Sequence, residues 1–480
     1  MTRRIRIACA LASLLLAGTA HAAGYGFSNT RAAGMGMAYT ALASGTHAAA
    51  WNPANLAAVP GPKVEIDLVS VGFHTGNDGV DYGDFIDWVD DEFISREELQ
   101  EALGMFPGGS LSLHNNTEVG ILPLSLSIGR FAFNTSFVLL TEIGVPRGIV
   151  DMLSDDRTHR ERYLEARGEG ITRQLEGMKA DMWGVGVMNF SYAQLFDIPQ
   201  MDRFAAGISA NVYLATPRFK ITRSEGELVV RGDTWETETA LLQMELGGAT
   251  IDRFEEQPGE KTTEFNTDGV AAWGLGLTLG AAGTWREVWD VSAAIHNIPV
   301  RPITWSNSER RTFELNTDGR KINAKSLFDD KPEGVETLDY LDTLFAKEGE
   351  TAETYEKLGS LTRAMPPFIR VGMAREFYKD KITWAVDIEQ GFSETAITST
   401  TPRIATGIEY RPIGEWIPLR AGMSIGGRTG HFASLGFGFH LKAFHWDFAF
   451  VNEGAFTPFE VPFMSRARGV GFSTQMKLAF

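Results

Sequence analysis

Residues 469–480 read GVGFSTQMKLAF, and they end the sequence on a strictly alternating pattern. Apart from one threonine, every second position is apolar, and the residues in phase are Val470, Phe472, Thr474, Met476, Leu478 and Phe480. Because successive side chains of a strand point to opposite faces, the pattern predicts a β-strand with one apolar and one polar face. That strand would end on an aromatic residue.

The same period of two recurs along the chain. Residues 122–140 read LPLSLSIGRFAFNTSFVLL, in which two alternating runs flank Gly129 and Arg130. Two strands joined by so short a connection form a β-hairpin. We find about fourteen such segments, each near the ~9–11 residues that a tilted strand needs to cross a membrane. We expect strands at 63–74, 117–129, 131–141, 181–195, 203–215, 267–282, 287–298, 366–377, 381–392, 401–412, 417–427, 431–442, 443–453 and 468–480.

The connections between these segments fall into two classes. Those after even-numbered strands are short, such as Gly129-Arg130 and 378–380, whereas those after odd-numbered strands are mostly long, such as 142–180 and 299–365. Short turns at one end and long loops at the other are typical of outer-membrane barrels. A soluble sandwich has no reason to sort its loops in this way.

The N-terminus predicts export. Three arginines precede an apolar run from Ile7 to Ala17, and Ala20-His21-Ala22 follows, so residues 1–22 have the form of a cleavable signal peptide. Cys9 is the single cysteine and lies within that signal, so the mature chain would hold no disulfide. The formal net charge is −17, which excludes nucleic-acid binding through a basic surface. No later stretch is long and apolar enough to be a transmembrane helix.

We therefore predict an all-β fold, a transmembrane antiparallel barrel of about fourteen strands in the cell outer membrane of a Gram-negative bacterium. The apolar strand faces would contact lipid, and the polar faces would line the lumen. The last strand must pair with the first, because unpaired backbone groups in lipid cost several kcal/mol each. The terminal Phe480 resembles the signal that such barrels present to the barrel-assembly machinery, which we expect as a partner together with outer-membrane lipid and lipopolysaccharide.

The segment before the first strand narrows the prediction. Residues 33–38 read AGMGMA and residues 51–56 read WNPANL, which resembles the N-terminal hatch of the FadL family of outer-membrane transporters. The resemblance implies a fourteen-stranded barrel with a plug inside it. The long acidic loops are most similar to those of family relatives that have no established substrate or are labelled as conjugal-transfer proteins.

We thus expect a hatch at 23–62 and a barrel at 63–480. The expected gating residues are Gly34, Gly36, Asn52, Pro53 and Ala54. Small residues allow close backbone packing, and Asn-Pro favours a sharp turn. The Asn-Pro-Ala stretch could alternatively do no more than end a periplasmic helix.

Strand phase turns a set of charged and histidine side chains toward the lumen. They are Arg370, Asp387, Glu389, Arg403, Arg420, His440, His445, Asp447 and Lys477. Their mixed signs indicate ion pairs that brace the wall and seat the hatch, since an ion-selective ring would carry one sign.

No enzymatic or metal site is indicated. No G-x-S-x-G motif accompanies His440, His445 and Asp447, and neither C-x-x-C nor H-E-x-x-H occurs. We expect neither catalysis nor a cofactor. The long loops contain helical patterns, at Ser95-Arg96-Glu97-Glu98 and within 151–180 and 333–362, so we also expect partly helical extracellular loops.

The resemblance implies passive, FadL-like uptake of a hydrophobic small molecule, of the long-chain fatty acid or aromatic type. The alternative is a non-transport outer-membrane protein that serves assembly, secretion or conjugal transfer as a docking partner.

Overall fold

The structure is a computed structural model, which describes most of the chain from residue 26 onward. The described residues are 26–77, 110–146, 171–174, 176–231, 234–236, 240–257, 260–267, 270–316, 322–323, 350–378, 381–395, 397–414, 416–428, 430–454 and 468–480. The predicted signal peptide and the predicted helix after Ser95 lie outside these residues. Among the described residues, no helix is long and apolar enough to cross a membrane.

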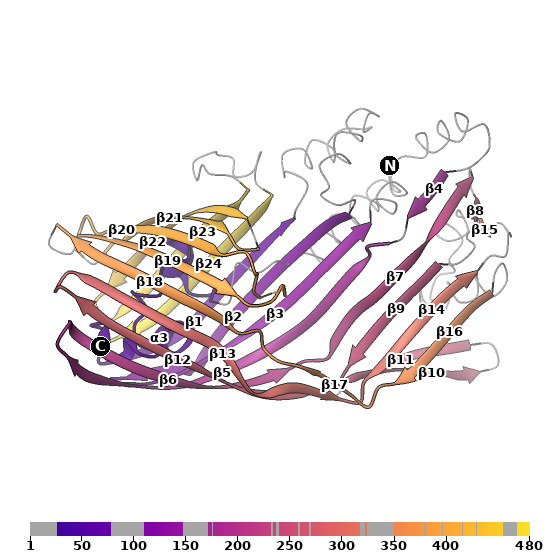
Figure 1. Cartoon of the computed structure of the whole chain (residues 1–480), viewed down its shortest axis with the longest axis horizontal. Coiled ribbons are helices and arrows are strands. Elements are labelled where there is room, and N and C mark those ends of the chain that lie inside the picture. The colour runs from indigo at the N-terminus through magenta and orange to yellow at the C-terminus, as the bar shows by residue number, and fades with distance from the viewer. Residues whose placement is uncertain are drawn as a thin grey trace.

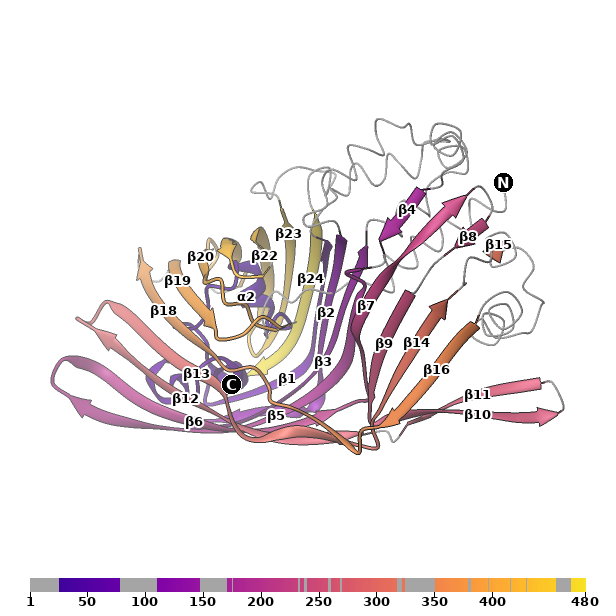
Figure 2. The same cartoon turned by 45° about the vertical axis from the view of Figure 1, so that its right-hand side comes forward.

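Fourteen antiparallel strands form a closed barrel, drawn at the left of Figure 1 and seen from another side in Figure 2. In order around the wall they are β1 (Val64–Asn77), β2 (Ser110–Ile128), β3 (Phe131–Pro146), β5 (Lys179–Ile198), β6 (Met201–Ala215), β12 (Ala272–Trp285), β13 (Trp289–Ser306), β18 (Phe368–Phe377), β19 (Ile382–Gly391), β20 (Arg403–Tyr410), β21 (Leu419–Gly426), β22 (His431–Leu441), β23 (Phe444–Glu453) and β24 (Gly469–Ala479).

The seam between the first and last strands is closed. β1 pairs with β24 from Glu65 opposite Ala479 to Gly76 opposite Gly469. Beyond that ladder, the Phe480 N–H donates to the Val64 carbonyl at 2.8 Å. Closure leaves neither strand with a free edge, which a barrel in lipid requires. The predicted closed antiparallel barrel of fourteen strands is confirmed.

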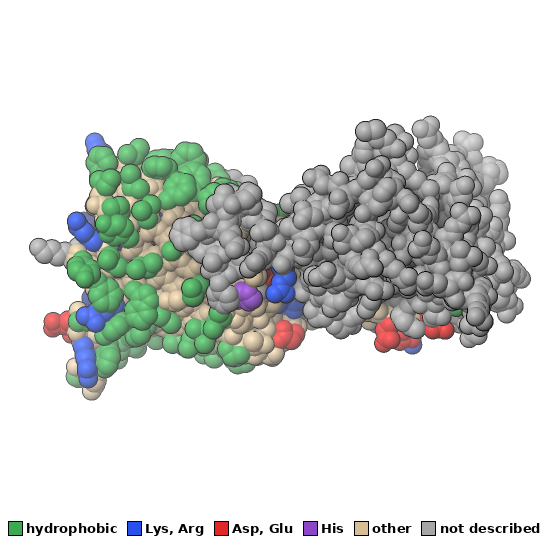
Figure 3. Space-filling view, turned by 90° about the horizontal axis from the view of Figure 1, so that it is seen from above, with side chains coloured by type: hydrophobic (Ala, Val, Ile, Leu, Met, Phe, Trp, Pro, Cys, Tyr) green, Lys and Arg blue, Asp and Glu red, His purple; other side chains and the backbone are tan. Residues whose placement is uncertain are grey.

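The two faces of the wall differ in the way that the sequence predicts. On neighbouring β5 and β6, Phe190 and Ile208 are exposed on the outside, whereas Ser209 and Asn211 are buried inside. Hydrophobic side chains cover much of the barrel face seen in Figure 3, and Lys and Arg side chains gather along its left-hand edge. An apolar exterior around a polar interior is the arrangement suited to lipid.

The chain also builds a sheet beyond the barrel, which we call the extension. β7 (Arg218–Arg231) pairs with the start of β5, and β9 (Ala240–Gly247), β14 (Glu309–Asn316) and β16 (Glu350–Lys357) follow in that order (Figure 1). The smaller strands are β4 (Ile171–Gln174), β8 (Thr234–Glu236), β15 (Ile322–Asn323), β17 (Ser360–Arg363) and the hairpin of β10 (Ala249–Gln257) with β11 (Glu260–Thr267).

The extension corrects one prediction. Residues 333–362 carry apolar side chains at helical spacing, yet the described part of that range forms strands β16 and β17. β16 pairs with β14, and β17 pairs with β13. Long-range pairing overrides the weak helical pattern because the neighbouring strands supply partners for the backbone groups.

Residues 26–59 lie inside the barrel, and we call them the plug. They contain three short helices, α2 (Thr30–Gly34), α3 (Gly45–Trp51) and α4 (Asn55–Ala58). Figure 2 shows α2 within the ring of strands. Phe27, Met35 and Trp51 are completely or almost completely buried, so the plug forms a core with the inner face of the wall.

Glycines on the inner face of the wall allow the plug backbone to approach. A Cβ atom at Gly422 of β21 would lie 2.1 Å from the carbonyl carbon of Met35, and one at Gly207 of β6 would lie 2.3 Å from the nitrogen of Ala54. Neither position can hold a side chain while the plug keeps its place. Glycines of the wall, like those of the plug, thus allow the two backbones to come into contact.

We expect Gly422→Ala to destabilise the seated plug by about 1–3 kcal/mol, the usual cost of overpacking. Protease sensitivity within 26–59 should rise while the barrel keeps its folded band in unheated SDS gels. Gly186→Ala is the matched control, because its Cβ would meet no atom closer than 3.6 Å. Equal protease resistance in both variants would contradict the fit described here.

Candidate functional site

Asp387 on β19 holds one end of the plug's central turn. Its Oδ2 accepts hydrogen bonds from the Tyr39 N–H at 2.9 Å, the Thr40 N–H at 2.7 Å and the Thr40 hydroxyl at 2.6 Å. The carboxylate is buried. Three donors from two adjacent plug residues therefore meet on one buried oxygen of the wall.

Arg31 in α2 joins a network of charges on the wall. Its guanidinium pairs with both oxygens of Glu409, at 2.9 and 3.0 Å. Arg420 donates to Glu409 at 2.6 Å and to Asp447 at 2.6 Å. Burial by itself lowers the pKa of the Arg31 guanidinium, but the Glu409 carboxylate outweighs burial and raises that pKa above its usual range. Arg31 therefore stays charged, and its forked geometry orients α2.

The start of α3 contacts the two strands that meet at the seam. Thr46 donates from its N–H and its hydroxyl to Glu65 of β1, both at 3.0 Å. The ring of His47 lies 3.1 Å from Asp67 of β1, and Lys477 of β24 donates to Glu65 at 3.0 Å. A plug residue, the first strand and the last strand thus share one buried polar cluster.

The predicted gating residues Asn52, Pro53 and Ala54 lie against β12, β13 and β6. The Asn52 side-chain amide donates to the Ser292 hydroxyl at 2.5 Å and to the Ala281 carbonyl at 3.1 Å. Its carbonyl oxygen accepts from the Ala54 N–H at 3.0 Å, which closes a local turn across Pro53. Asn52 is therefore a contact between the plug and the wall.

The predicted gating glycines lie at the opposite side of the plug. Gly36 has a φ of 65°, a left-handed backbone conformation that glycine adopts without strain, and its N–H donates to the Ser434 hydroxyl at 2.9 Å. A Cβ at Gly34 would lie 3.1 Å from the Cα of Gly436. Both glycines are in close contact with wall backbone or side chains.

The structure brings together three of the predicted lumen residues beneath Trp51. Glu389 accepts from Arg370 at 2.5 Å and from Arg403 at 2.9 Å. The Arg370 guanidinium also lies 4.2 Å from the centre of the Trp51 ring. This cluster braces three adjacent strands and supports the end of α3.

The two predicted lumen histidines are neighbours. The rings of His440 and His445 stack with their centres 4.0 Å apart, and His440 lies 3.2 Å from Asp447. His445 contacts the Lys442 carbonyl at 3.3 Å, in the turn that joins β22 to β23. His440 therefore extends the Arg31 network, whereas His445 lies at the edge of the barrel.

The described residues offer no arrangement for metal binding, because no group of three His, Cys, Asp or Glu side chains converges among them. The expectation that the chain is not an enzyme stays a prediction.

An apolar cluster lies next to the plug on five adjacent strands of the wall, and we call it the upper cluster. Its members come from five strands and three connections: Val138, Leu140, Trp183, Val185, Val187, Tyr213, Ala215, Ala271, Ala272, Ile303, Trp305, Met365 and Ile397. The rings of Trp183 and Trp305 meet edge to face with centres 5.8 Å apart. Ala50 of the plug packs against the cluster, so the two are continuous. This part of the lumen is apolar, contrary to the predicted polar lining.

Loops from the far wall reach the upper cluster across the mouth. Ile397, in the connection between β19 and β20, packs within it. Arg428, in the connection between β21 and β22, donates to Glu142 of β3 at 2.9 Å and to the Thr395 carbonyl at 3.0 Å. Among the described residues, Ile397 and the Arg428–Glu142 ion pair thus connect the far wall to this side of the barrel.

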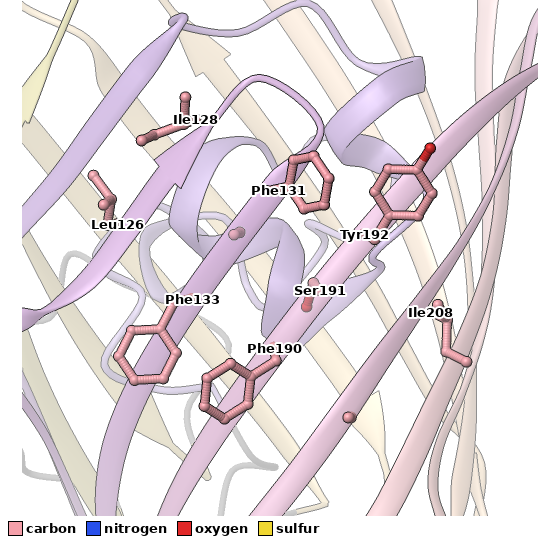
Figure 4. Close-up of a pocket in the computed structure, with 10 residues that line it drawn as sticks. Leu126, Ile128, Phe131, Phe133, Phe190, Ser191, Tyr192 and Ile208 are labelled. Carbon is pink, nitrogen blue, oxygen red and sulfur yellow. The ribbon is translucent and has the colours of Figure 1, made fainter.

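A shallow apolar groove of about 470 Å³ lies on the outside of the barrel (Figure 4). It runs over β2, β3, β5 and β6, where Phe131 stacks near Tyr192 at 4.8 Å and Phe133 near Phe190 at 4.7 Å. The groove adjoins the stretch of β2 between Val119 and Leu126, where the pairing with β3 shifts register. Its exposed rings are suited to contact with acyl chains.

Sequence reasoning placed Lys477 in the lumen, but it missed the upper cluster and the seam residues Glu65 and Asp67. Trp183, Val185 and Val187 share the phase of Asn189 and Ser191, so their inward position could have been read from the alternation. The contacts of Glu65 and Asp67 with the plug could not be predicted, because the alternation of a strand does not indicate which residues of the plug its inner face contacts.

Comparison with known proteins gives one family and several structures. The model of a family described as "Family of unknown function (DUF5723)" matches residues 53–450. The toluene transporter TbuX of Ralstonia pickettii is similar at 12% identity over 95% of this chain and 98% of that chain, with a TM-score of 0.48. A FadL homologue of Pseudomonas aeruginosa is similar at 13% identity over 94% and 98%, with a TM-score of 0.43. No curated protein matches.

We expect Asp387→Asn to loosen the plug without opening the wall. Loss of the carboxyl acceptor should speed hydrogen exchange at the amides of Tyr39 and Thr40 by up to about tenfold, since a hydrogen bond contributes ~0.5–1.5 kcal/mol. Asp290→Asn is the control, because Asp290 bonds to Thr284 of the neighbouring strand and to no plug residue. Unchanged exchange at both amides would show that Asp387 does not hold the plug.

Proposed function

The chain belongs to DUF5723, a family of unknown function, and we propose that it is a passive outer-membrane channel for hydrophobic small molecules. The observation that carries the proposal is the upper cluster. A pore for polar solutes needs a wet lumen, whereas thirteen buried apolar residues here pack together beside the plug.

The upper cluster suits an apolar passenger for an energetic reason. An apolar molecule that replaces one of these side-chain contacts gains about 25 cal/mol per Å² of its surface removed from water. An ion or sugar entering the same space loses hydrogen bonds to water and finds few partners. The cluster therefore acts as a barrier to polar solutes and as a binding region for apolar ones.

The proposed path has three steps. A hydrophobic molecule first enters beside the Arg428–Glu142 ion pair and the loop that carries Ile397. It then exchanges with the side chains of the upper cluster around Trp183 and Trp305. Finally it passes the plug, whose contacts with Asp387 and Arg31 must rearrange. The FadL resemblance favours a long-chain fatty acid or an aromatic hydrocarbon as the passenger.

A docking role is the second candidate, and the extension favours it. Among the described residues, four long strands, several short strands and the β10–β11 hairpin lie beyond the barrel. Replacement of residues 249–267 by a short turn separates the two roles. Neither role predicts an effect of this replacement on uptake. Only the docking role predicts that the variant loses a cross-linked protein partner.

The test of the channel proposal measures uptake and ion conductance on the same reconstituted protein. The wild-type chain should admit radiolabelled oleate or toluene into liposomes and show no steady ion conductance. Leu140→Asn, which wets the upper cluster, should reduce that uptake several-fold and introduce conductance.

Leu139→Asn is the matched control, because Leu139 is the next residue of β3 and is exposed on the outside of the barrel. Its uptake should equal that of the wild type. Large steady conductance and sucrose uptake by the wild-type protein would overturn the proposal.

A further inference from the structure

The alternation of β13 fails at one place on the outside of the barrel. Pro299, Val300 and Arg301 are all exposed, although three consecutive strand residues cannot share a face in a regular strand. The register with β12 shifts there, because Leu275 lies opposite Arg301 and Gly276 lies opposite Pro299. Bulges re-aim side chains in this way, and proline is tolerated at them.

The bulge presents Arg301 on an aromatic support. The carbon of its guanidinium lies 3.4 Å from the centre of the Trp273 ring, and Trp273 is itself exposed. Stacking orients the guanidinium and leaves its N–H groups free to point outward, along the plane of the group. The arrangement is prepared for a planar, two-point contact with an anion.

No carboxylate of the described chain lies within ion-pair distance of Arg301. Other arginines near this end of the barrel and in the extension do have such partners: Arg218 and Arg363 with Asp181, Arg310 with Glu245, and Arg428 with Glu142. Arg301 thus differs from these arginines, because its guanidinium is available to an anion from outside the protein.

The depth of Arg301 identifies the source of that anion. It stands about twelve residues beyond Trp289, where β13 leaves its short turn, and a rise of ~3.3 Å per residue at a tilt of ~40° places it ~30 Å away. The apolar band of such barrels is about 25 Å tall. Arg301 thus lies at the outer edge of the bilayer, above the exposed Ile295 and Leu279.

We propose that Arg301 and Trp273 bind a phosphate group of the glycolipid that forms the outer leaflet. The guanidinium would donate two parallel hydrogen bonds to the phosphate oxygens. The free edge of the Trp273 ring would contact the sugar or the start of an acyl chain, as interfacial aromatics do. The site lies on the outer face and does not depend on channel activity.

The test uses the full-length protein in detergent and a rough lipopolysaccharide that carries both lipid A phosphates. Binding is measured by native mass spectrometry and by the rise in thermal unfolding temperature. We expect Arg301→Ala to weaken the apparent affinity about tenfold, which corresponds to ~1.4 kcal/mol. Trp273→Leu should weaken it less. Equal affinity of Arg301→Ala and the wild type overturns the proposal.

Two controls make the test specific. Arg286→Ala removes an arginine that stacks on Trp285 at 4.3 Å at the opposite end of the barrel, and it should bind the glycolipid like the wild type. Removal of the phosphates from lipid A should weaken binding to the wild type about tenfold. For Arg301→Ala, the same removal should leave the affinity unchanged. If inorganic phosphate at the same concentration stabilises the protein equally, the site recognises free phosphate and the glycolipid assignment is wrong.

Discussion

The pairing of β1 with β24 is the constraint on which the rest of the structure depends. Lipid offers no hydrogen-bond partner, so every backbone group in the wall must be satisfied by a neighbouring strand. The ladder from Glu65 to Gly76 removes the last two edges. Closure then separates an apolar exterior from an enclosed interior, in which the plug is held.

The plug is bound to the two strands that close the barrel. Thr46 and His47 contact Glu65 and Asp67 of β1, and Lys477 of β24 reaches the same cluster. Glycines such as Gly422 admit the plug backbone, while Asp387 accepts its N–H groups. The interior therefore has two parts of different chemistry: a part around the plug that combines buried apolar packing with many hydrogen bonds, and the apolar upper cluster.

The wall could be predicted from the sequence because its information is local. Alternation and short turns such as Gly129-Arg130 locate the barrel strands without knowledge of their neighbours. The helical expectation for 333–362 was wrong in the described part of that range, because strand pairing with β14 and β13 outweighs a weak local pattern. The upper cluster was missed because phase tells which way Trp183 points, but not that Trp305 and Ile397 meet it across the lumen.

A disulfide across the seam tests the closed wall most directly. The mature chain would hold no native cysteine, so cysteines at Val71 and Thr474, which lie opposite each other on β1 and β24, would be its only thiols. The account predicts near-complete oxidation of this pair in membranes, matching a pair at Phe448 and Thr474 within the sheet. A cross-link between Phe448 and Thr474, with none between Val71 and Thr474, would show an open wall and contradict the account.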